Sequence, residues 1–376
     1  MRTKVVISSF LLWALCPSLY AKPVDVSMQN DVVKGIQEEL LTTLKNEVTP
    51  VISAKEVSPA IQQLIAEIKK EEPNYDVIDM ILRSGNVDFD EKDEMGYSAL
   101  MWSVGLGKRY IAQRLFWKSN LDLQNNEGET ALIMAISKGR REIIDDMLNN
   151  ILNKYNNISI DLNIQDGIGY NALAYAIQRN DKKTVQQLLS VKNSEGKYAV
   201  TLNPKDLKKR YGKGNSPLID SVKHEDGEIF EMIFNAKDEN GNYRADVNYV
   251  SDLGWTVLSM ATGKPSTYVY NYPFVEKILE AKDNTGNYRM TNFDGRRLTE
   301  NPLFQAVTYK NLENVKLLTQ AKDRNGKCRV DFNVTIDEDI SHLGIKQGDT
   351  ALDMAIKMKQ EEIAQVLLSA MMECKK

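Results

Sequence analysis

Residues that could carry out catalysis or bind a metal are few in this chain. Its 376 residues include two histidines and three cysteines. His224 and His342 lie in polar stretches typical of loops, and no group of His, Cys, Asp or Glu has the spacing of a metal site. No Gly-x-Ser-x-Gly nucleophile motif is present. The sequence therefore predicts no catalytic, cofactor or metal site.

Two segments resemble ligand-binding loops only in part. Residues 212–216, Gly-Lys-Gly-Asn-Ser, contain the residue types of a phosphate-binding loop, but not in the order Gly-x4-Gly-Lys-Ser. Residues 238–242, Asp-Glu-Asn-Gly-Asn, contain oxygen ligands suited to calcium. Their glycine has the wrong offset for an EF-hand, and no Glu completes the loop. We interpret both segments as loops without a ligand.

The charge of the chain excludes one class of partner. The formal net charge is −4 at pH 7, and Lys residues alternate with Asp and Glu instead of forming blocks. Nucleic-acid-binding proteins need a basic face that neutralises phosphates. We therefore expect no nucleic-acid partner.

The first 21 residues have the pattern of a secretory signal peptide. Arg2 and Lys4 precede an apolar run at residues 5–16, and small or neutral residues end at Ala21. The run is shorter than the roughly 20 residues that span a bilayer. Cys16 lacks the preceding residues of a lipoprotein signal, so a lipid anchor is the weaker alternative, and a buried N-terminal helix is another. We expect an exported protein, periplasmic or secreted, with no transmembrane segment.

A short phrase returns seven times along the chain. It reads Gly, a variable residue, a Ser, Thr or Asn, usually Ala or Pro, then Leu, two variable residues and a small residue. Its copies occupy residues 96–103, 128–135, 169–176, 214–221, 254–261, 299–306 (which lacks the glycine) and 348–355. Ser, Thr and Asn are good helix N-caps, and Ala or Pro suits the first helical turn. The phrase therefore predicts the start of a short helix, whose small residue allows close approach of a neighbouring helix.

A second apolar pair follows each phrase about twelve residues after its Leu. The pairs are Ile144 with Met147, Val185 with Leu188, Phe230 with Ile233, Val275 with Ile278, Val315 with Leu318 and Ile363 with Val366. This spacing places each pair on one face of a second helix. Repetition on this scale is typical of a solenoid, in which each unit buries its apolar face only by stacking on its neighbours.

The phrase and its second helix resemble the ankyrin repeat. Residues 84–93, Ser-Gly-Asn-Val-Asp-Phe-Asp-Glu-Lys-Asp, are similar to the connector that ends a repeat in that family. The His that often follows the Leu in the family is absent from every copy. The resemblance implies an all-α ankyrin-repeat solenoid of helix-turn-helix units with β-hairpin fingers over residues 57–376. It comprises an N-terminal capping repeat and about seven further repeats.

The repeats are mostly longer than the family's usual length of about 33 residues. Four copies of one insertion explain part of the excess, at residues 191–198, 236–243, 281–288 and 321–328. Asn240-Gly241 and Asn325-Gly326 are typical of two-residue hairpin turns. We therefore expect elongated β-fingers after the second helices.

The segment before the repeats carries an apolar stripe at helical spacing. Val33, Ile36, Leu40, Leu44 and Val48 predict an amphipathic helix within residues 22–56. We interpret this helix as a cover for the first repeat. The alternative is a helix offered to a partner.

The resemblance also implies a docking surface, made of hairpin tips and the concave face of the first helices. Aromatic residues dominate interface hot spots, and three copies of the phrase have one after the glycine. The predicted partner-binding residues are Tyr97, Tyr170 and Trp255 in this row, Leu106, Arg179 and Tyr309 past the small residue, and Tyr268, Tyr270 and Tyr272 in one expanded loop. The alternative for the row is that each ring packs on its neighbouring finger.

Two cysteines remain after cleavage of the predicted signal. By repeat alignment, Cys374 falls just past the last helix, and Cys328 lies on the finger after the neighbouring one. One disulfide between them and two unpaired thiols are both open. We expect a monomeric, non-catalytic scaffold that binds a protein partner which the sequence does not identify. The alternatives are a secreted effector acting on a host protein and an enzyme with its site in the insertions.

Overall fold

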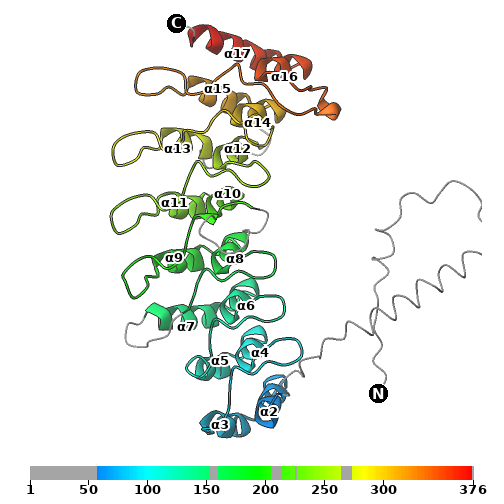
Figure 1. The fold of residues 1–376 in the computed structure, drawn as a ribbon, viewed down its shortest axis with the longest axis vertical. Helices are drawn as coiled ribbons and strands as arrows, with labels where there is room; N and C mark the ends of the chain where they lie inside the picture. The colour runs from blue at the N-terminus through cyan, green and yellow to red at the C-terminus, as the bar shows by residue number, and fades with distance from the viewer. Residues whose placement is uncertain (1–56, 153–159, 205–213, 225–226, 264–272, 375–376) are drawn as a thin grey trace, which may run out of the picture. The chain divides into compact units, whose positions relative to one another are not determined.

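The computed structural model describes residues 57–152, 160–204, 214–224, 227–263 and 273–374. The predicted signal peptide (1–21), the predicted amphipathic segment (22–56) and the three tyrosines of the expanded loop, Tyr268, Tyr270 and Tyr272, lie outside the described residues. From Val57 onward the chain forms one unit. Its helices follow one another as stacked pairs (Figure 1).

Each pair has a first and a second helix. The first helices are α2 (Pro59–Ile68), α4 (Ala99–Gly105), α6 (Ala131–Ser137), α8 (Ala172–Gln178), α10 (Pro217–Ser221), α12 (Val257–Thr262), α14 (Pro302–Thr308) and α16 (Ala351–Lys357). The second helices are α3 (Tyr75–Arg83), α5 (Arg109–Leu115), α7 (Arg141–Leu152), α9 (Lys182–Ser190), α11 (Glu228–Phe234), α13 (Phe274–Glu280), α15 (Leu312–Gln320) and α17 (Glu361–Glu373). First helices pack on first helices, as α4 does on α2 and α6, and the second helices form the other layer. The predicted all-α ankyrin-repeat solenoid is confirmed.

The N-caps predicted from the repeated phrase begin the first helices. Thr130 Oγ1 accepts a hydrogen bond from Ile133 N at 3.2 Å, and Asn171 Oδ1 accepts one from Ala174 N at 3.0 Å. The same bond is made by the cap residue of the five other copies of the phrase. Each cap satisfies a backbone amide that the helix leaves unpaired, and contributes about 1 kcal/mol.

The core lies between the two layers and continues from repeat to repeat. The Leu of each of the first six phrases is almost completely buried, as are Ile144 and Leu188 of the second helices, whereas Leu352 of the last phrase is partly buried. The small residues of the phrase, such as Ser103 and Ala135, are fully buried where neighbouring helices meet. Each buried Leu or Ile contributes roughly 1.5–3 kcal/mol, so stability depends on every unit having a neighbour.

A ladder of Asp and Asn side chains joins the connectors of successive repeats. Asp90 Oδ1 accepts a hydrogen bond from Asn120 N at 2.7 Å, and Asp122 Oδ1 accepts one from Asp161 N at 2.9 Å. The same bond is made by Asn163, Asn203, Asn248 and Asp294. Each rung satisfies a connector amide across a repeat boundary, which fixes one repeat relative to the next.

A second ladder runs through the insertions. The Tyr243 ring contacts Lys237 of its own insertion, with Nζ 4.6 Å from the ring centre, and Arg289 of the next insertion. Arg289 Nη1 also donates a hydrogen bond to Phe234 O at 2.8 Å. Arg244 with Tyr198 and Arg329 with Tyr288 repeat this arrangement. The insertions are therefore linked by cation–π contacts and by bonds to backbone carbonyls.

A disulfide occupies the last position of this second ladder. Cys328 stands where the earlier insertions have tyrosine. It is bonded to Cys374, just after α17, with a Cα–Cα distance of 5.8 Å. The bond ties the last insertion to the last helix, where no later insertion supplies an arginine.

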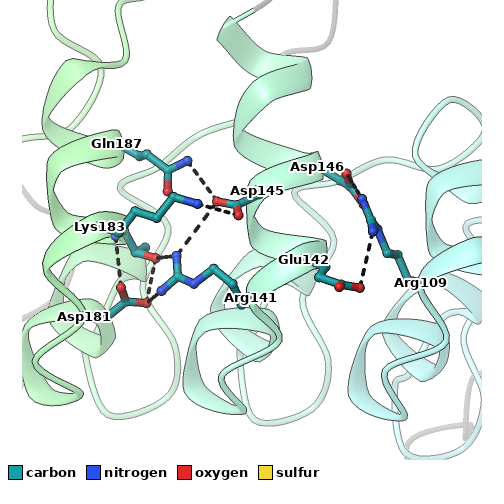
Figure 2. A network of polar contacts seen from close by, with 9 residues as sticks. Arg109, Arg141, Glu142, Asp145, Asp146, Asp181, Lys183 and Gln187 are labelled. Carbon is teal, nitrogen blue, oxygen red and sulfur yellow. Dashed lines mark hydrogen bonds and ion pairs between the residues drawn. The ribbon is translucent and has the colours of Figure 1, made fainter.

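Ion pairs connect the second helices of adjacent repeats, as Figure 2 shows. Arg109 of α5 makes a bidentate contact with Asp146 of α7, at 2.6 and 2.9 Å. Arg141 of α7 pairs with Asp181, which caps α9. Lys183 of α9 lies 2.6 Å from Asp145. These contacts lie away from the first helices and fasten α5, α7 and α9 to one another.

The insertions differ from the predicted elongated fingers. Each is closed by a single isolated bridge, such as that between Lys237 and Tyr243. The predicted two-residue Asn-Gly turn is wrong, because only Gly241 has a left-handed φ, of 80°. Gly241 N donates to Asp238 O at 3.1 Å, and Asp238 N donates to Asn242 O at 2.8 Å. The Asp238 carboxylate also accepts bonds from Asn240 N and Asn242 N, which favours this longer turn.

Candidate functional site

The same turn occurs at two positions along the stack, and the repeats of α8–α9 and α12–α13 have it at both. The first set, here called the front turns, precedes the first helices at residues 93–97, 125–129, 166–170 and 251–255. The second set, the back turns, follows the second helices at residues 193–197, 238–242, 283–287 and 323–327. In each, the amide of the fourth residue, a left-handed glycine, donates to the carbonyl of the first. The side chain of the first residue accepts from the amide of the fifth. In Figure 1 the two sets lie on opposite sides of the stack.

The two sets differ at the residue before the glycine, which is the tip. Three front tips are large and apolar, and their side chains are exposed: Met95 at 51%, Ile168 at 63% and Leu253 at 51%. The fourth front tip is Glu127. All four back tips are polar and exposed: Glu195, Asn240, Thr285 and Asn325. The two sets of turns have the same backbone geometry, so this geometry does not explain why the front tips are apolar. Exposed apolar residues on one side of a protein are typical of an interaction surface.

A groove of about 460 Å³ lies between the first two front turns and the helices α4 and α6. Its apolar lining includes Tyr97, Trp102 and Met134. The Tyr97 and Trp102 rings lie 5.0 Å apart, and Trp102 Nε1 donates to Asp93 Oδ2 at 2.8 Å. Asp93 therefore fixes both its own turn and the aromatic ring on the helix.

The predicted aromatic row lies along the front turns, with its rings leaning on the first helices. Tyr170 contacts Tyr175 edge-on, with ring centres 5.8 Å apart. Tyr175 donates a hydrogen bond to Asp166 Oδ2 at 2.6 Å, as Trp102 does to Asp93. Trp255 is half-buried against the core. Burial and this hydrogen bond raise the pKa of Tyr175, which keeps the phenol as a donor. The rings therefore support the front turns and expose only part of their surface.

The other predicted residues lie at the C-terminal ends of first helices. Leu106 and Tyr309 follow α4 and α14 and are 42% and 39% exposed. Arg179, which follows α8, is exposed and donates from Nη1 to Ser137 O at 3.0 Å. Leu106 lines the groove described above, together with Tyr97. The structure thus brings Tyr97 and Leu106 to one site and distributes Tyr170, Arg179, Trp255 and Tyr309 along later repeats.

The tips Met95, Ile168 and Leu253 were missed by the sequence reasoning. A signal was present, because the residue before the phrase's glycine is apolar in these three copies and polar in every insertion. The signal is visible only when the phrase and the insertion are recognised as the same turn. We call the front tips, the groove and the exposed ends of the first helices the front surface.

Among the described residues, no group of three or more His, Cys, Asp and Glu side chains is arranged to hold a metal ion. None of the helices described is both long and apolar enough to cross a membrane.

Comparison with known proteins identifies the repeat. Residues 64–158 match the family model described as ankyrin repeats in three copies. No curated protein matches the chain. One similar solved structure is titled the Bd0816 predatory endopeptidase from Bdellovibrio bacteriovorus in complex with immunity protein Bd3460. That match has 20% identity and a TM-score of 0.39, and covers 55% of this chain and 92% of the other.

A second similar structure is the ankyrin repeat domain of Bcl-3, described as a unique member of the IkappaB protein family. The identity is 15%, the TM-score is 0.45, and the match covers 83% of this chain and 99% of that domain. These two likenesses are too distant to carry an argument about function. The family match places ankyrin repeats at residues 64–158, and helix pairs of the same kind continue to Glu373.

Proposed function

We propose that this protein is a non-catalytic scaffold that binds another protein through its front surface. Ankyrin repeats are generally modules for protein–protein interaction. The observation that carries the proposal is the difference between the two sets of turns. Turns of the same backbone geometry have exposed apolar tips on the front side, Met95, Ile168 and Leu253, and polar tips on the back side. A partner that covers the front tips would remove this apolar surface from water.

Export to an oxidising compartment is part of the same proposal. Two features support it: the signal-like pattern of residues 1–21 and the disulfide between Cys328 and Cys374. Structural disulfides persist outside the reducing cytosol. Secretion of the tagged chain, with cleavage before Lys22, would be measured by fractionation and N-terminal sequencing.

The docking proposal is tested by comparing two triple variants of the full chain. The first replaces the apolar front tips by serine: Met95→Ser, Ile168→Ser and Leu253→Ser. The matched control changes the equivalent back tips: Asn240→Ser, Thr285→Ser and Asn325→Ser. Both leave the glycine and the first residue of each turn intact, so both are expected to fold like the wild type.

Proteins captured from an extract of the source cells by each variant are then quantified, and binding is repeated with the purified partner. We expect the front-tip variant to lose the partner and the control to retain it. Equal capture by the two variants, with matched circular-dichroism melting curves, means that the front surface is not the docking site.

A further inference from the structure

The groove between α4 and α6 is lined by a glycine. Gly105 ends α4 and lines the groove beside Leu106 and Met134. A Cβ atom at Gly105 would lie 3.3 Å from the Met134 Cε methyl, in ordinary helical backbone. A larger side chain there would therefore displace the Met134 methyl and occupy part of the groove. The apolar lining suits an apolar group from outside.

The rim of this groove is acidic on the side of the front turns. Glu94 and Glu127 both line it, both are exposed, and within the described residues neither carboxylate has a hydrogen bond or ion pair. Asn126 Nδ2 donates to Glu94 O at 3.2 Å, which links the two turns. Burial, and then the nearby carboxylates of Glu129 and Glu127, raise the pKa of Tyr97. Glu127 and Glu129 therefore place negative charge near the Tyr97 ring.

Cations near the rim do not neutralise these two carboxylates. The Lys69 ammonium lies 3.8 Å from the centre of the Trp102 ring and 3.8 Å from Asp93 Oδ2, so it is already engaged. Lys138 lines the groove from α6, on the side of the helices. A cation from outside would be repelled by Lys138 and attracted by Glu94 and Glu127. The charges therefore orient a bound segment with its cation toward the front turns.

A second groove adjoins the first across the turn at residues 93–97. It has a volume of about 560 Å³, and its lining includes Ile65 and Ala66 of α2. Glu94 and Met95 line both grooves. Neighbouring helices lie about 8–10 Å apart, and an extended chain advances about 3.3 Å per residue. Side chains at alternate positions of an extended segment share one face, so two apolar side chains four residues apart, about 13 Å, would reach the two grooves, and the side chain midway between them would face Glu94.

We propose that the first two front turns bind an extended segment of a partner protein that carries a lysine or arginine between two apolar residues. This assignment rests on the proposed docking function and names the chemistry of what docks. The apolar side chains occupy the grooves on either side of Met95, and the cation faces Glu94 and Glu127. Front tips farther along the stack enlarge the contact with the partner but do not determine the preference for a basic residue between two apolar residues.

The probe is a random peptide library displayed on phage and selected on the immobilised full chain. Selected peptides are synthesised, and their affinities are measured by fluorescence anisotropy. The charge variant is Glu94→Lys with Glu127→Lys, and the groove variant is Gly105→Leu. The matched charge control is Glu276→Lys with Glu280→Lys on α13, where both residues are exposed. Melting curves establish that all three variants remain folded.

We expect enriched peptides to contain Lys or Arg flanked by apolar residues. The charge variant should bind them roughly fivefold to tenfold more weakly, since two exposed ion pairs become repulsive. It should bind better the same peptide with Glu in place of its cation. Gly105→Leu should weaken binding of both peptides, and the α13 control should bind like the wild type.

Peptides without a basic preference, or peptides whose affinity is unchanged by charge reversal, overturn this inference. If the front-tip triple variant still loses the captured partner, the docking proposal survives alone. If that variant keeps the partner and no peptide is enriched, both proposals fail. Self-association of the chain that is abolished by Glu94→Lys with Glu127→Lys identifies a second copy as the occupant and also overturns the inference.

Discussion

The guanidinium carbon of Arg289 lies 3.6 Å from the centre of the Tyr243 ring, across a repeat boundary. Arg289 is only 9% exposed, and its hydrogen-bond acceptors are the carbonyls of Phe234 and Ala245. Burial lowers the pKa of Arg289 to about 10, because the charge is removed from water without a carboxylate to replace it. A buried cation in this position is retained for the contacts it makes between repeats.

Replacing Arg289 should therefore weaken the boundary between the repeats of Tyr243 and Tyr288. We expect Arg289→Met to lower the free energy of unfolding by about 2–3 kcal/mol, since the cation–π contacts with Tyr243 and Phe234 and the hydrogen bonds to two backbone carbonyls are lost. Urea unfolding followed by circular dichroism measures the change. The control is Arg297→Met, whose guanidinium is exposed and reaches Glu300 only at 3.9 Å. An equal effect of the two substitutions contradicts the role of the ladder.

The Asp122 rung predicts a gain in stability on neutralisation. Burial and the charge of Asp161 raise the pKa of Asp122, although Asp161 N donates to its carboxylate. Because the pKa of Asp122 is higher in the folded chain, ionising this carboxyl lowers the free energy of unfolding. The full loss applies above the folded-state pKa, and there is no loss below the ordinary Asp value of about 4. Asp122→Asn should therefore raise the unfolding free energy at pH 7 by a few tenths of a kcal/mol, allowing for solvent screening.

The advantage of Asp122→Asn should disappear as the pH is lowered through the carboxyl range. Urea unfolding at a series of pH values provides the measurement. The reciprocal control is Asn163→Asp, which places a carboxylate on the next rung and should cost stability at pH 7. Lower stability of Asp122→Asn at pH 7 would show that the carboxylate is needed there.

Asp181 should show the opposite dependence on pH. Burial alone would raise its pKa, but hydrogen bonds from Arg141 and Thr184 lower it overall. A lowered folded-state pKa contributes stability above the ordinary value, and this is lost as the pH falls through the folded pKa. Asn can retain the cap to Thr184 N, so Asp181→Asn removes mainly the ion pair drawn in Figure 2.

We expect Asp181→Asn to cost about 1 kcal/mol at pH 7, because the pair is only partly shielded from solvent. The difference from the wild type should shrink in acid and in high salt. It is measured by the same unfolding series. A loss that is independent of both pH and salt would indicate a packing effect instead of an ion pair.

The disulfide should stabilise the last repeat more than the others. Replacing Cys328 and Cys374 by serine opens a cross-link that spans 46 residues in sequence. A loss of about 2–4 kcal/mol is expected for a loop of this size. Hydrogen exchange should increase in α15 to α17 while α4 to α8 stay protected, because each repeat contacts only its neighbours.

Intact mass without reductant checks the bond itself. The expected value is two hydrogens below that of the reduced chain. A chain that retains both thiols after oxidative purification excludes the disulfide.

Features set by neighbours in sequence were predictable here. The caps Thr130 and Asn171 were readable because each side chain bonds to an amide three residues away. The approach of Cys328 to Cys374 was foreseeable from the phase of the repeats. The turn type at Asn240 was missed, because the sequence reasoning overlooked the Asp238 side chain, whose bonds to two backbone amides favour another geometry.

Features that join different repeats were harder to predict. Tyr243 and Arg289 belong to separate insertions, and their contact depends on how the helices between them stack. The groove depends on the position of Gly105 opposite Met134, which only the packing of α4 on α6 defines. The aromatic row lies along the front turns, and the packing of its rings on Trp102 and Tyr175 required coordinates.

The front and back turns share one backbone geometry, and the residues that maintain this geometry differ from the residue exposed at the tip. The first and fourth residues of each turn maintain the loop, whereas the apolar tips Met95, Ile168 and Leu253 have no side-chain group that can form a strong hydrogen bond with it. Substitutions at Met95, Ile168 or Leu253 can therefore accumulate over evolutionary time with little penalty to the scaffold. On the proposed docking function, a change of one side chain per front turn would alter the partner and leave the fold intact.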